Sequence, residues 1–204
     1  VETYATNVLG LVNLLNISKK CMRLKALLNV TSDKCYQNNE WLWGYRESDR
    51  LGGHDPYSNS KACAELVTSS FRQSFFDKLN IGLATARAGN VIGGGDWSQD
   101  RLIPDFIRAQ QNSTGLSIRN PKAIRPWQHV IEPVFGYLRL CEKLYQEPKK
   151  YSDAWNFGPN DFGMVDVETV INEMQSHVSE SVNVTFNKDE SMHEASLLKL
   201  DVSK

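Results

Sequence analysis

The chain has 204 residues, 41% of them hydrophobic, and a formal net charge of −1 at pH 7. This length and composition suffice to bury one sizeable core, whereas a nearly neutral surface is unsuited to neutralising a nucleic-acid backbone or an anionic membrane. No apolar run approaches the roughly 20 residues of a membrane-spanning helix. We therefore expect a globular protein without nucleic-acid or membrane partners.

The N-terminal residues and the cysteines bear on location and metal binding. Residues 1–7 lack the basic stretch and the apolar segment of a secretory signal. The four cysteines are widely spaced and match no metal-ligand pattern. These features predict reduced thiols, a cytoplasmic location and no metal site.

The first half of the chain alternates helix and strand signals. Apolar residues recur at helical spacing from Val1 to Lys20, and Ala26 to Thr31 is a short apolar run typical of a buried parallel strand. Neither a methionine nor a capping residue precedes the first helix. A start of this kind fits a chain that is part of a longer protein.

A long connection and a second helix follow this strand. Residues 35–56 are rich in aromatic, glycine and acidic residues without periodicity, which predicts a functional loop. Pro56 favours the start of a helix that ends near Phe76, and residues 81–86 predict a second strand. The alternation of strand, helix and strand predicts an α/β domain with a mainly parallel sheet.

Beyond Asp100 the signals are mixed and indicate a smaller region that covers the substrate. Helices are expected at 104–110, 133–145 and 165–179, and strands are expected near Leu116, Ala154 and Val182. Because strands and helices alternate on both sides of residue 93, we expect the two regions to interleave.

Tyr57 and Lys61 form a Tyr-x-x-x-Lys pattern, which places both side chains on one helix face. An ammonium group one turn away stabilises a phenolate, so the pair could serve as a general base. The spacing also arises often by chance, and a surface tyrosine beside a solvated lysine explains it about as well.

Ser32, Asp33 and Lys34 follow directly after the first predicted strand. Open α/β sheets hold ligands and catalytic groups at this edge, and Ser32 could hydrogen-bond the hydroxyl of Tyr57. The alternative is a simple turn, in which the acid caps a backbone amide and the lysine lies in water.

Gly93 to Gly95 follow a strand but lack the G-x-G-x-x-G spacing of a dinucleotide-binding loop. The candidate diphosphate ligands, with Asn90 and Arg125 preferred, are Asn90, Arg101, Arg119 and Arg125, because amide and guanidinium donors suit phosphate oxygens. Each of these residues alone is more often an ordinary surface residue.

Four motifs together resemble the extended short-chain dehydrogenase/reductase family and, within it, the nucleotide-sugar 4,6-dehydratases. They are Asn7-Val8-Leu9-Gly10, Thr31-Ser32-Asp33-Lys34-Cys35-Tyr36, Tyr57-Ser58-Asn59-Ser60-Lys61 and Arg87-Ala88-Gly89-Asn90-Val91-Ile92-Gly93. Residues 52–57, 93–97, 125–130 and 193–195 extend the resemblance along nearly the whole chain.

For the fold, the resemblance implies the C-terminal part of a Rossmann-like, doubly wound parallel sheet at residues 1–92. It implies a smaller mixed α/β substrate-binding region, interleaved with the first, at residues 93–204. The family's glycine-rich loop should precede Val1 by on the order of a hundred residues. We therefore expect the chain as given to bind NAD weakly and to be inactive alone.

For the activity, the resemblance implies NAD-dependent dehydration of CDP-glucose to a 4-keto-6-deoxy sugar, a step of deoxysugar biosynthesis for lipopolysaccharide O-antigens. Tyr57 would remove the O4 proton with help from Lys61, Asp33 would protonate the departing C6 hydroxyl, and Lys34 would take the C5 proton. The implied catalytic set is Ser32, Asp33, Lys34, Tyr57 and Lys61; the cofactor set is Tyr57, Lys61 and Ala88; and the substrate set is Asn90, Arg101, Arg125 and His193.

Two other functions remain open from the sequence. An epimerase or reductase of the same family would use Tyr57 and Lys61 but has no need of an acid such as Asp33. A non-catalytic binding or assembly module would use neither chemistry. The resemblance also implies a homo-oligomer that pairs through the first helix and the helix that carries Tyr57.

Overall fold

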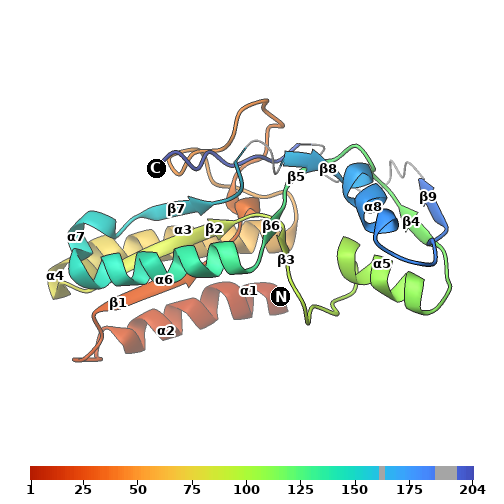
Figure 1. Cartoon of the computed structure of the whole chain (residues 1–204). Coiled ribbons are helices and arrows are strands. Elements are labelled where there is room, and N and C mark those ends of the chain that lie inside the picture. The colour runs from red at the N-terminus through yellow and green to blue at the C-terminus, as the bar shows by residue number, and fades with distance from the viewer. Residues whose placement is uncertain (161–163, 187–196) are drawn as a thin grey trace.

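A three-stranded parallel sheet in the order β1-β2-β7 organises the chain, and the computed structural model describes it within residues 1–160, 164–186 and 197–204 (Figure 1). The strands are Ala26–Val30 (β1), Gly82–Ala88 (β2) and Ala154–Phe157 (β7). In the parallel register, Ala26 pairs with Gly82 and Thr85 pairs with Ala154. The strand sequences therefore end at one common edge.

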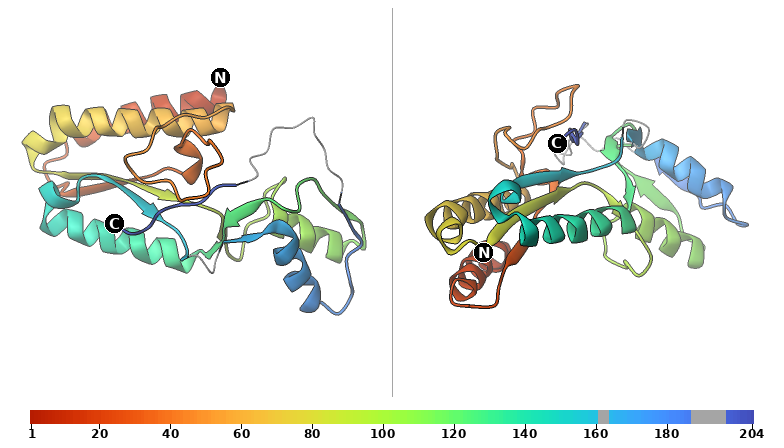
Figure 2. Two further views of the ribbon diagram at one scale, coloured as in Figure 1. Left: turned by 90° about the horizontal axis from the view of Figure 1, so that it is seen from above. Right: turned by 60° about the vertical axis from the view of Figure 1, so that its left-hand side comes forward.

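Helices cover both faces of this sheet, with α2 and α3 on one face and α6 on the other (Figure 2). On the first face lie α1 (Glu2–Tyr4), the π-helical segment η1 (Ala5–Leu9), α2 (Gly10–Ser18), α3 (Pro56–Phe71), the π-helical segment η3 (Arg72–Phe76) and α4 (Asp77–Leu79). The other face carries α6 (Ile131–Gln146) and α7 (Pro148–Tyr151).

The apolar residues of the strands alternate between two cores. Leu83 packs with Leu15 and Phe76 between the sheet and α2 and α3. Ala84, the next residue of β2, packs with Leu144 of α6 on the opposite side. A run of consecutive apolar residues in β2 therefore reflects burial on both faces, as in other parallel sheets.

The start of α3 is fixed by its own sequence. Asp55 lies just before the helix in an extended conformation, and its Oδ1 accepts hydrogen bonds from the backbone N–H groups of Tyr57 at 2.9 Å and Ser58 at 3.0 Å. Pro56 occupies the first turn, where no N–H partner is required. Tyr57 is thus held in the first, capped turn of the helix.

The second lobe lies beside the carboxyl end of the sheet (Figure 1). It contains α5 (Leu102–Gln111), α8 (Val167–Ser176) and three two-stranded sheets, which pair β3 (Val91–Ile92) with β6 (Gln128–His129), β4 (Leu116–Ile118) with β9 (Val184–Phe186), and β5 (Ile124–Pro126) with β8 (Met164–Asp166). Phe106 and Ile171 are central to its core.

The expected α/β fold is confirmed, with the predicted helices and main strands near their expected positions. The sequence analysis missed β3, β5, β6 and β8, because strands of two or three residues are too short to show a period. Residues 131–157 lie beyond residue 93 and yet supply α6 and β7 to the first lobe. Within the described ranges, no helix is long and apolar enough to cross a membrane.

The core between the sheet and α6 gives a direct stability test. Leu144 is fully buried, whereas Leu138 on the same helix is 65% exposed. We expect Leu144→Ala to lower the free energy of unfolding by about 2–5 kcal/mol, because it leaves a cavity. The matched variant Leu138→Ala should change it by about 0.5 kcal/mol or less in denaturant titrations. Equal effects of the two variants would contradict this packing.

Candidate active site

Ser32 and Asp33 lie in the turn that follows β1, at the carboxyl edge of the sheet. The Oγ of Ser32 accepts a hydrogen bond from the backbone N–H of Lys34 at 3.2 Å and donates one to Oδ1 of Asp33 at 3.0 Å. Ser32 is thus the N-cap of the short 3-10 helix η2 (Asp33–Cys35). The hydroxyl proton of Ser32 points to Asp33, whereas the sequence had suggested a bond with Tyr57.

The carboxyl group of Asp33 is buried and only half satisfied. Its residue is 3% exposed, and its Oδ2 has no hydrogen-bond partner among the described residues. Burial raises the pKa of Asp33 and outweighs the opposing effects of the Ser32 hydrogen bond and of the Lys34 and Arg125 charges. The environment therefore favours the protonated acid, which is a proton donor.

The segment after β2 encloses this carboxyl group. A Cβ atom on Gly89 would lie 2.3 Å from Cγ of Pro126 and 3.2 Å from Oδ2 of Asp33. Only a glycine fits between these two neighbours without moving one of them. Asp33 is thus bordered by residues from three separate segments, its own turn, the end of β2 and β5.

Tyr57 lies on the exposed side of α3 between two lysines. Its residue is 44% exposed, and the Nζ atoms of Lys61 and Lys34 lie 5.9 Å and 6.0 Å from the centroid of its ring. Lys61 is half-buried, and its Nζ donates to the carbonyl oxygen of Val30 at 3.5 Å. Burial lowers the pKa of Lys61, and the charge of Glu65 opposes this effect.

The structure therefore brings the five expected catalytic residues to one edge of the sheet. Lys34 is exposed and its charge acts on Asp55, the cap of α3, as well as on Asp33. The Tyr57 and Lys61 pair and the Ser-Asp-Lys turn come from different elements. They meet because β1 ends, and α3 begins, at the same edge of the sheet. Their shared position makes a chance occurrence of the Tyr-x-x-x-Lys spacing a poor explanation.

The expected binding residues are more scattered. Ala88 is the last residue of β2, and the carbonyl oxygen of Asn90 accepts a hydrogen bond from the backbone N–H of Gln128 at 2.9 Å. Arg125 is buried in β5, where its charge acts on Asp33. Arg101 lies apart, at the start of α5 in the second lobe, with its Nε 3.5 Å from Asp96. His193 lies outside the described residues.

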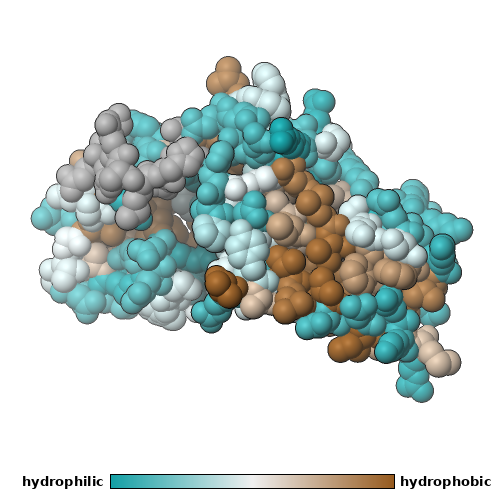
Figure 3. All heavy atoms as spheres, turned by 180° about the vertical axis from the view of Figure 1, so that it is seen from behind, coloured by the Kyte–Doolittle hydropathy of each residue, from teal (hydrophilic) through white to brown (hydrophobic). Residues whose placement is uncertain are grey.

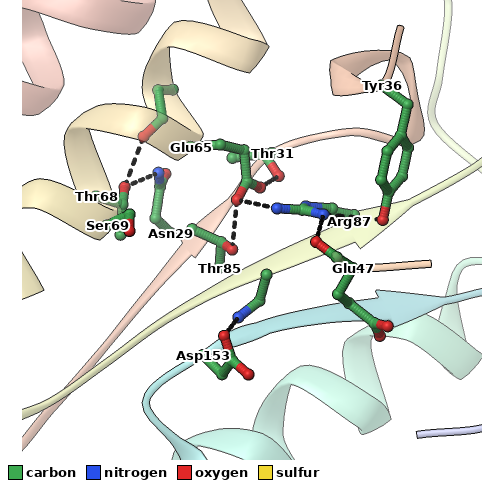
Figure 4. Close-up of polar contacts among 12 residues, drawn as sticks. Asn29, Thr31, Tyr36, Glu47, Glu65, Thr68, Ser69, Thr85, Arg87 and Asp153 are labelled. Carbon is green, nitrogen blue, oxygen red and sulfur yellow. Dashed lines mark hydrogen bonds and ion pairs between the residues drawn. The ribbon is translucent and has the colours of Figure 1, made fainter. Parts of the chain in front are cut away.

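Sequence reasoning gave no role to a buried ion pair beside this cluster. Nη2 of Arg87 lies 2.8 Å from Oε2 of Glu65, and both side chains are almost completely buried (Figure 4). Two signals pointed to the pair. Glu65 follows Lys61 by four residues on the same helix face, and Arg87 is the one charged residue of its strand.

This fold and cluster define an α/β protein with a tyrosine and lysine pair and a buried acid at the carboxyl edge of its parallel strands. Residues 1–158 match the NAD dependent epimerase/dehydratase family, and the chain belongs to that family. The match confirms the kinship that the sequence motifs indicated.

Two sequence relatives show how far the likeness extends. The chain is 52% identical over 209 residues to the CDP-glucose 4,6-dehydratase of Salmonella typhimurium. This match covers 100% of this chain and 58% of that protein. It is 26% identical to UDP-glucuronic acid decarboxylase 2 of Arabidopsis thaliana, covering 100% of this chain and 44% of that protein. The chain thus spans about half the length of these curated relatives.

A solved structure with the same fold is the dTDP-glucose 4,6-dehydratase of Bacillus anthracis in complex with NAD. It is 20% identical, with a TM-score of 0.79 over 98% of this chain and 60% of that one. The UDP-glucuronic acid 4-epimerase of Bacillus cereus, in complex with UDP-glucuronic acid and NAD, is 18% identical, with a TM-score of 0.80 over 98% of this chain and 60% of that one. At these identities the likeness establishes the fold alone.

The burial of Asp33 predicts an unusual pH dependence of stability. Below the unfolded pKa of about 3.9, both states keep the proton. As pH rises from there to the raised folded pKa, the unfolded state ionises first, and stability falls by about 1.4 kcal/mol per pH unit. We therefore expect Asp33→Asn to become more stable relative to the parent as pH rises above the unfolded pKa of about 3.9.

Asp55→Asn is the matched control for this test. Partial burial raises the pKa of Asp55, but hydrogen bonds from Ser58 and Tyr57 prevail and lower it. Ionised Asp55 therefore stabilises the native state above its unfolded pKa, and this variant should lose stability at neutral pH and regain parity as pH falls. Denaturant titrations across the pH range measure both effects. A gap between Asp33→Asn and the parent that does not change with pH would contradict the assignment of Asp33.

Proposed function

We propose that this chain is the catalytic part of an NAD-dependent CDP-glucose 4,6-dehydratase that converts CDP-glucose to its 4-keto-6-deoxy derivative. The observation that carries the proposal is the buried carboxyl group of Asp33, whose Oδ2 has no partner among the described residues, at the same edge of the sheet as the Tyr57 and Lys61 pair. Elimination of water from C6 requires an acid that holds a proton at neutral pH, and burial supports that state of Asp33. The 52% identity to the Salmonella dehydratase supports the same activity and the cytidine nucleotide.

The residues at the sheet edge fit a nicotinamide cofactor. The ammonium of Lys61 has three donors, of which the carbonyl of Val30 takes one, so it can also bind ribose hydroxyls. Ala88 and Gly89 present little side chain where the cofactor would approach the end of β2. When bound, NAD supplies hydride chemistry at C4 and C6 of the sugar.

Three residues of this chain handle the protons. Tyr57, with its phenolate held beside Lys61, takes the proton of the C4 hydroxyl, and oxidation at C4 makes the C5 hydrogen acidic. Lys34 is the base that takes the C5 proton. Asp33 donates its proton to the C6 hydroxyl, which leaves as water, and Ser32 orients the carboxyl through its bond to Oδ1.

An epimerase of the same family is the alternative. Such an enzyme shares the tyrosine and lysine pair but gains nothing from a protonated acid, since it expels no hydroxyl group. The environment of Asp33 therefore favours dehydration.

We further propose Asn90, Arg101, Arg125 and His193 as substrate ligands. Arg125 is the best placed of them, because its charge acts on Asp33.

We also propose that a second copy of this chain covers the outer face of α2 and α3. Figure 3 shows apolar residues gathered on that side of the molecule, and the exposed apolar residues there include Leu14, Ile17 and Leu66. A patch of this kind supports a protein partner. The proposal also includes a reducing, cytoplasmic location and a role in O-antigen sugar synthesis. The free state of all four cysteines supports the reducing location.

Replacing Asp33 by Asn tests the proposal in a full-length protein that carries this chain. The variant keeps the shape of the side chain but lacks the acid, so CDP-glucose should still reduce bound NAD while water is lost slowly. Absorbance of the reduced nicotinamide should accumulate, and mass spectrometry should show little loss of water. Tyr57→Phe is the matched control, because it should block the oxidation and leave NAD unreduced. Parent-like loss of water in Asp33→Asn would remove Asp33 as the acid.

A further inference from the structure

Glu65 is the centre of a buried polar network between α3 and the sheet (Figure 4). Its side chain is 3% exposed, and Oε1 accepts a hydrogen bond from the hydroxyl of Thr31. Oε2 accepts bonds from the hydroxyl of Thr85 at 2.7 Å and from Nη2 of Arg87 at 2.8 Å. One carboxylate of α3 is thus bound to both β1 and β2 near their carboxyl ends.

Arg87 extends this network to the loop that precedes α3. Its Nη1 donates to the hydroxyl of Tyr36 at 2.9 Å and to the carbonyl oxygen of Glu47 at 3.0 Å. Tyr36 in turn donates to Oδ1 of Asn156 in β7 at 2.6 Å. The guanidinium group therefore connects β2, β7 and both halves of the loop.

These contacts connect the strands, the loop before α3 and α3 itself, so α3 is held at two points. The loop that Arg87 holds runs on to Asp55, whose side chain caps the first turn of α3 at Tyr57. Two turns later, Glu65 fixes the same helix to the strands, and Lys61 lies between the two anchors. The first strand anchor, Thr31, directly precedes Ser32 and Asp33. Both halves of the catalytic cluster are therefore attached to one ion pair.

Stability alone does not account for such a pair. A buried ion pair loses the hydration of two charges, and well-packed apolar residues of similar volume often stabilise a protein at least as well. Four polar partners around two charges instead impose one geometry, because each hydrogen bond has a narrow range of distance and angle. The network suits a task that needs α3 at a fixed position on the sheet.

We propose that Glu65 and Arg87 are positioning residues, which hold α3 in the position that turns Tyr57 and Lys61 toward Ser32, Asp33 and Lys34. Neither residue contacts the substrate in this role. The inference rests on the proposed dehydration. In this role, Glu65 and Arg87 set the distance between the base on α3 and the acid after β1. A displacement of about 1 Å at such a site can lower a rate about 100-fold.

Three variants of the full-length protein test this role. Glu65→Gln keeps the size of the side chain and leaves Arg87 without its counter-ion, whereas Glu65→Gln combined with Arg87→Met removes both charges. Thr68→Val is the control, because Thr68 is a fully buried polar residue of α3 whose hydroxyl bonds with Ala64 and Asn29, outside the network. For each variant, kcat and KM for CDP-glucose and the melting temperature are measured.

If the pair has a positioning role, the variants should change the melting temperature and kcat to different extents. We expect Glu65→Gln to lower the melting temperature and to reduce kcat by about 10-fold to 100-fold, with KM within about twofold of the parent. The double variant should regain most of the melting temperature but not the lost kcat. Thr68→Val should lose stability while keeping a kcat within about twofold of the parent. Recovery of kcat together with stability in the double variant, or an equal loss of kcat in Thr68→Val, would overturn the proposal.

A spectroscopic measurement keeps this test independent of the proposed activity. Tyrosine labelled with carbon-13 at Cζ gives a signal for Tyr57 that Tyr57→Phe identifies. Glu65→Gln and the double variant should move this signal in the absence of substrate, whereas Thr68→Val should leave it in place. A parent protein that does not convert CDP-glucose would refute the proposed function and leave this measurement valid, while an unmoved signal would refute the positioning role.

Discussion

The parallel pairing of β1 with β2 is the constraint on which the rest of the structure depends. Parallel neighbours require a crossover connection, so α3 must pass across one face of the sheet between them. The pairing continues past the end of β1, where the backbone N–H of Thr31 donates to the carbonyl oxygen of Ala86 at 2.8 Å. Ser32 and Asp33 therefore emerge beside the end of β2, at the edge where α3 begins.

Two buried carboxyl groups at this edge have opposite surroundings. Glu65 and Asp33 are equally buried, at 3% exposure each. Glu65 has a guanidinium group and two hydroxyl groups as partners, which between them contact both of its carboxylate oxygens. Asp33 has one hydroxyl donor to Oδ1 and, among the residues that the structure describes, none to Oδ2, and burial raises its pKa. Two carboxyl groups at the same depth therefore differ in their polar partners.

The sequence predicted the features that depend on neighbouring residues. Helix periodicity, the apolar strands and the start of α3 at Pro56 follow from local patterns, and the structure has each of them. The placement of Ser32, Asp33 and Lys34 at a strand end followed from the general rule for parallel sheets. Short strands such as β3 and β6 carry no period, and the partner of Glu65 lies 22 residues further along the chain. Pairing over that distance depends on the register of the sheet, which no local pattern specifies.

In the proposed dehydration, C4 of the sugar is oxidised and C6 of the same sugar is reduced, while Asp33 protonates the departing C6 hydroxyl. The most direct measurement uses CDP-glucose that carries deuterium at C4, turned over by a full-length protein with this chain. The account predicts a 4-keto-6-deoxy product with the deuterium at C6, since the hydrogen taken from C4 is returned within the site. Deuterium that remains at C4, as in an epimerase, or a product that keeps its C6 hydroxyl would contradict it.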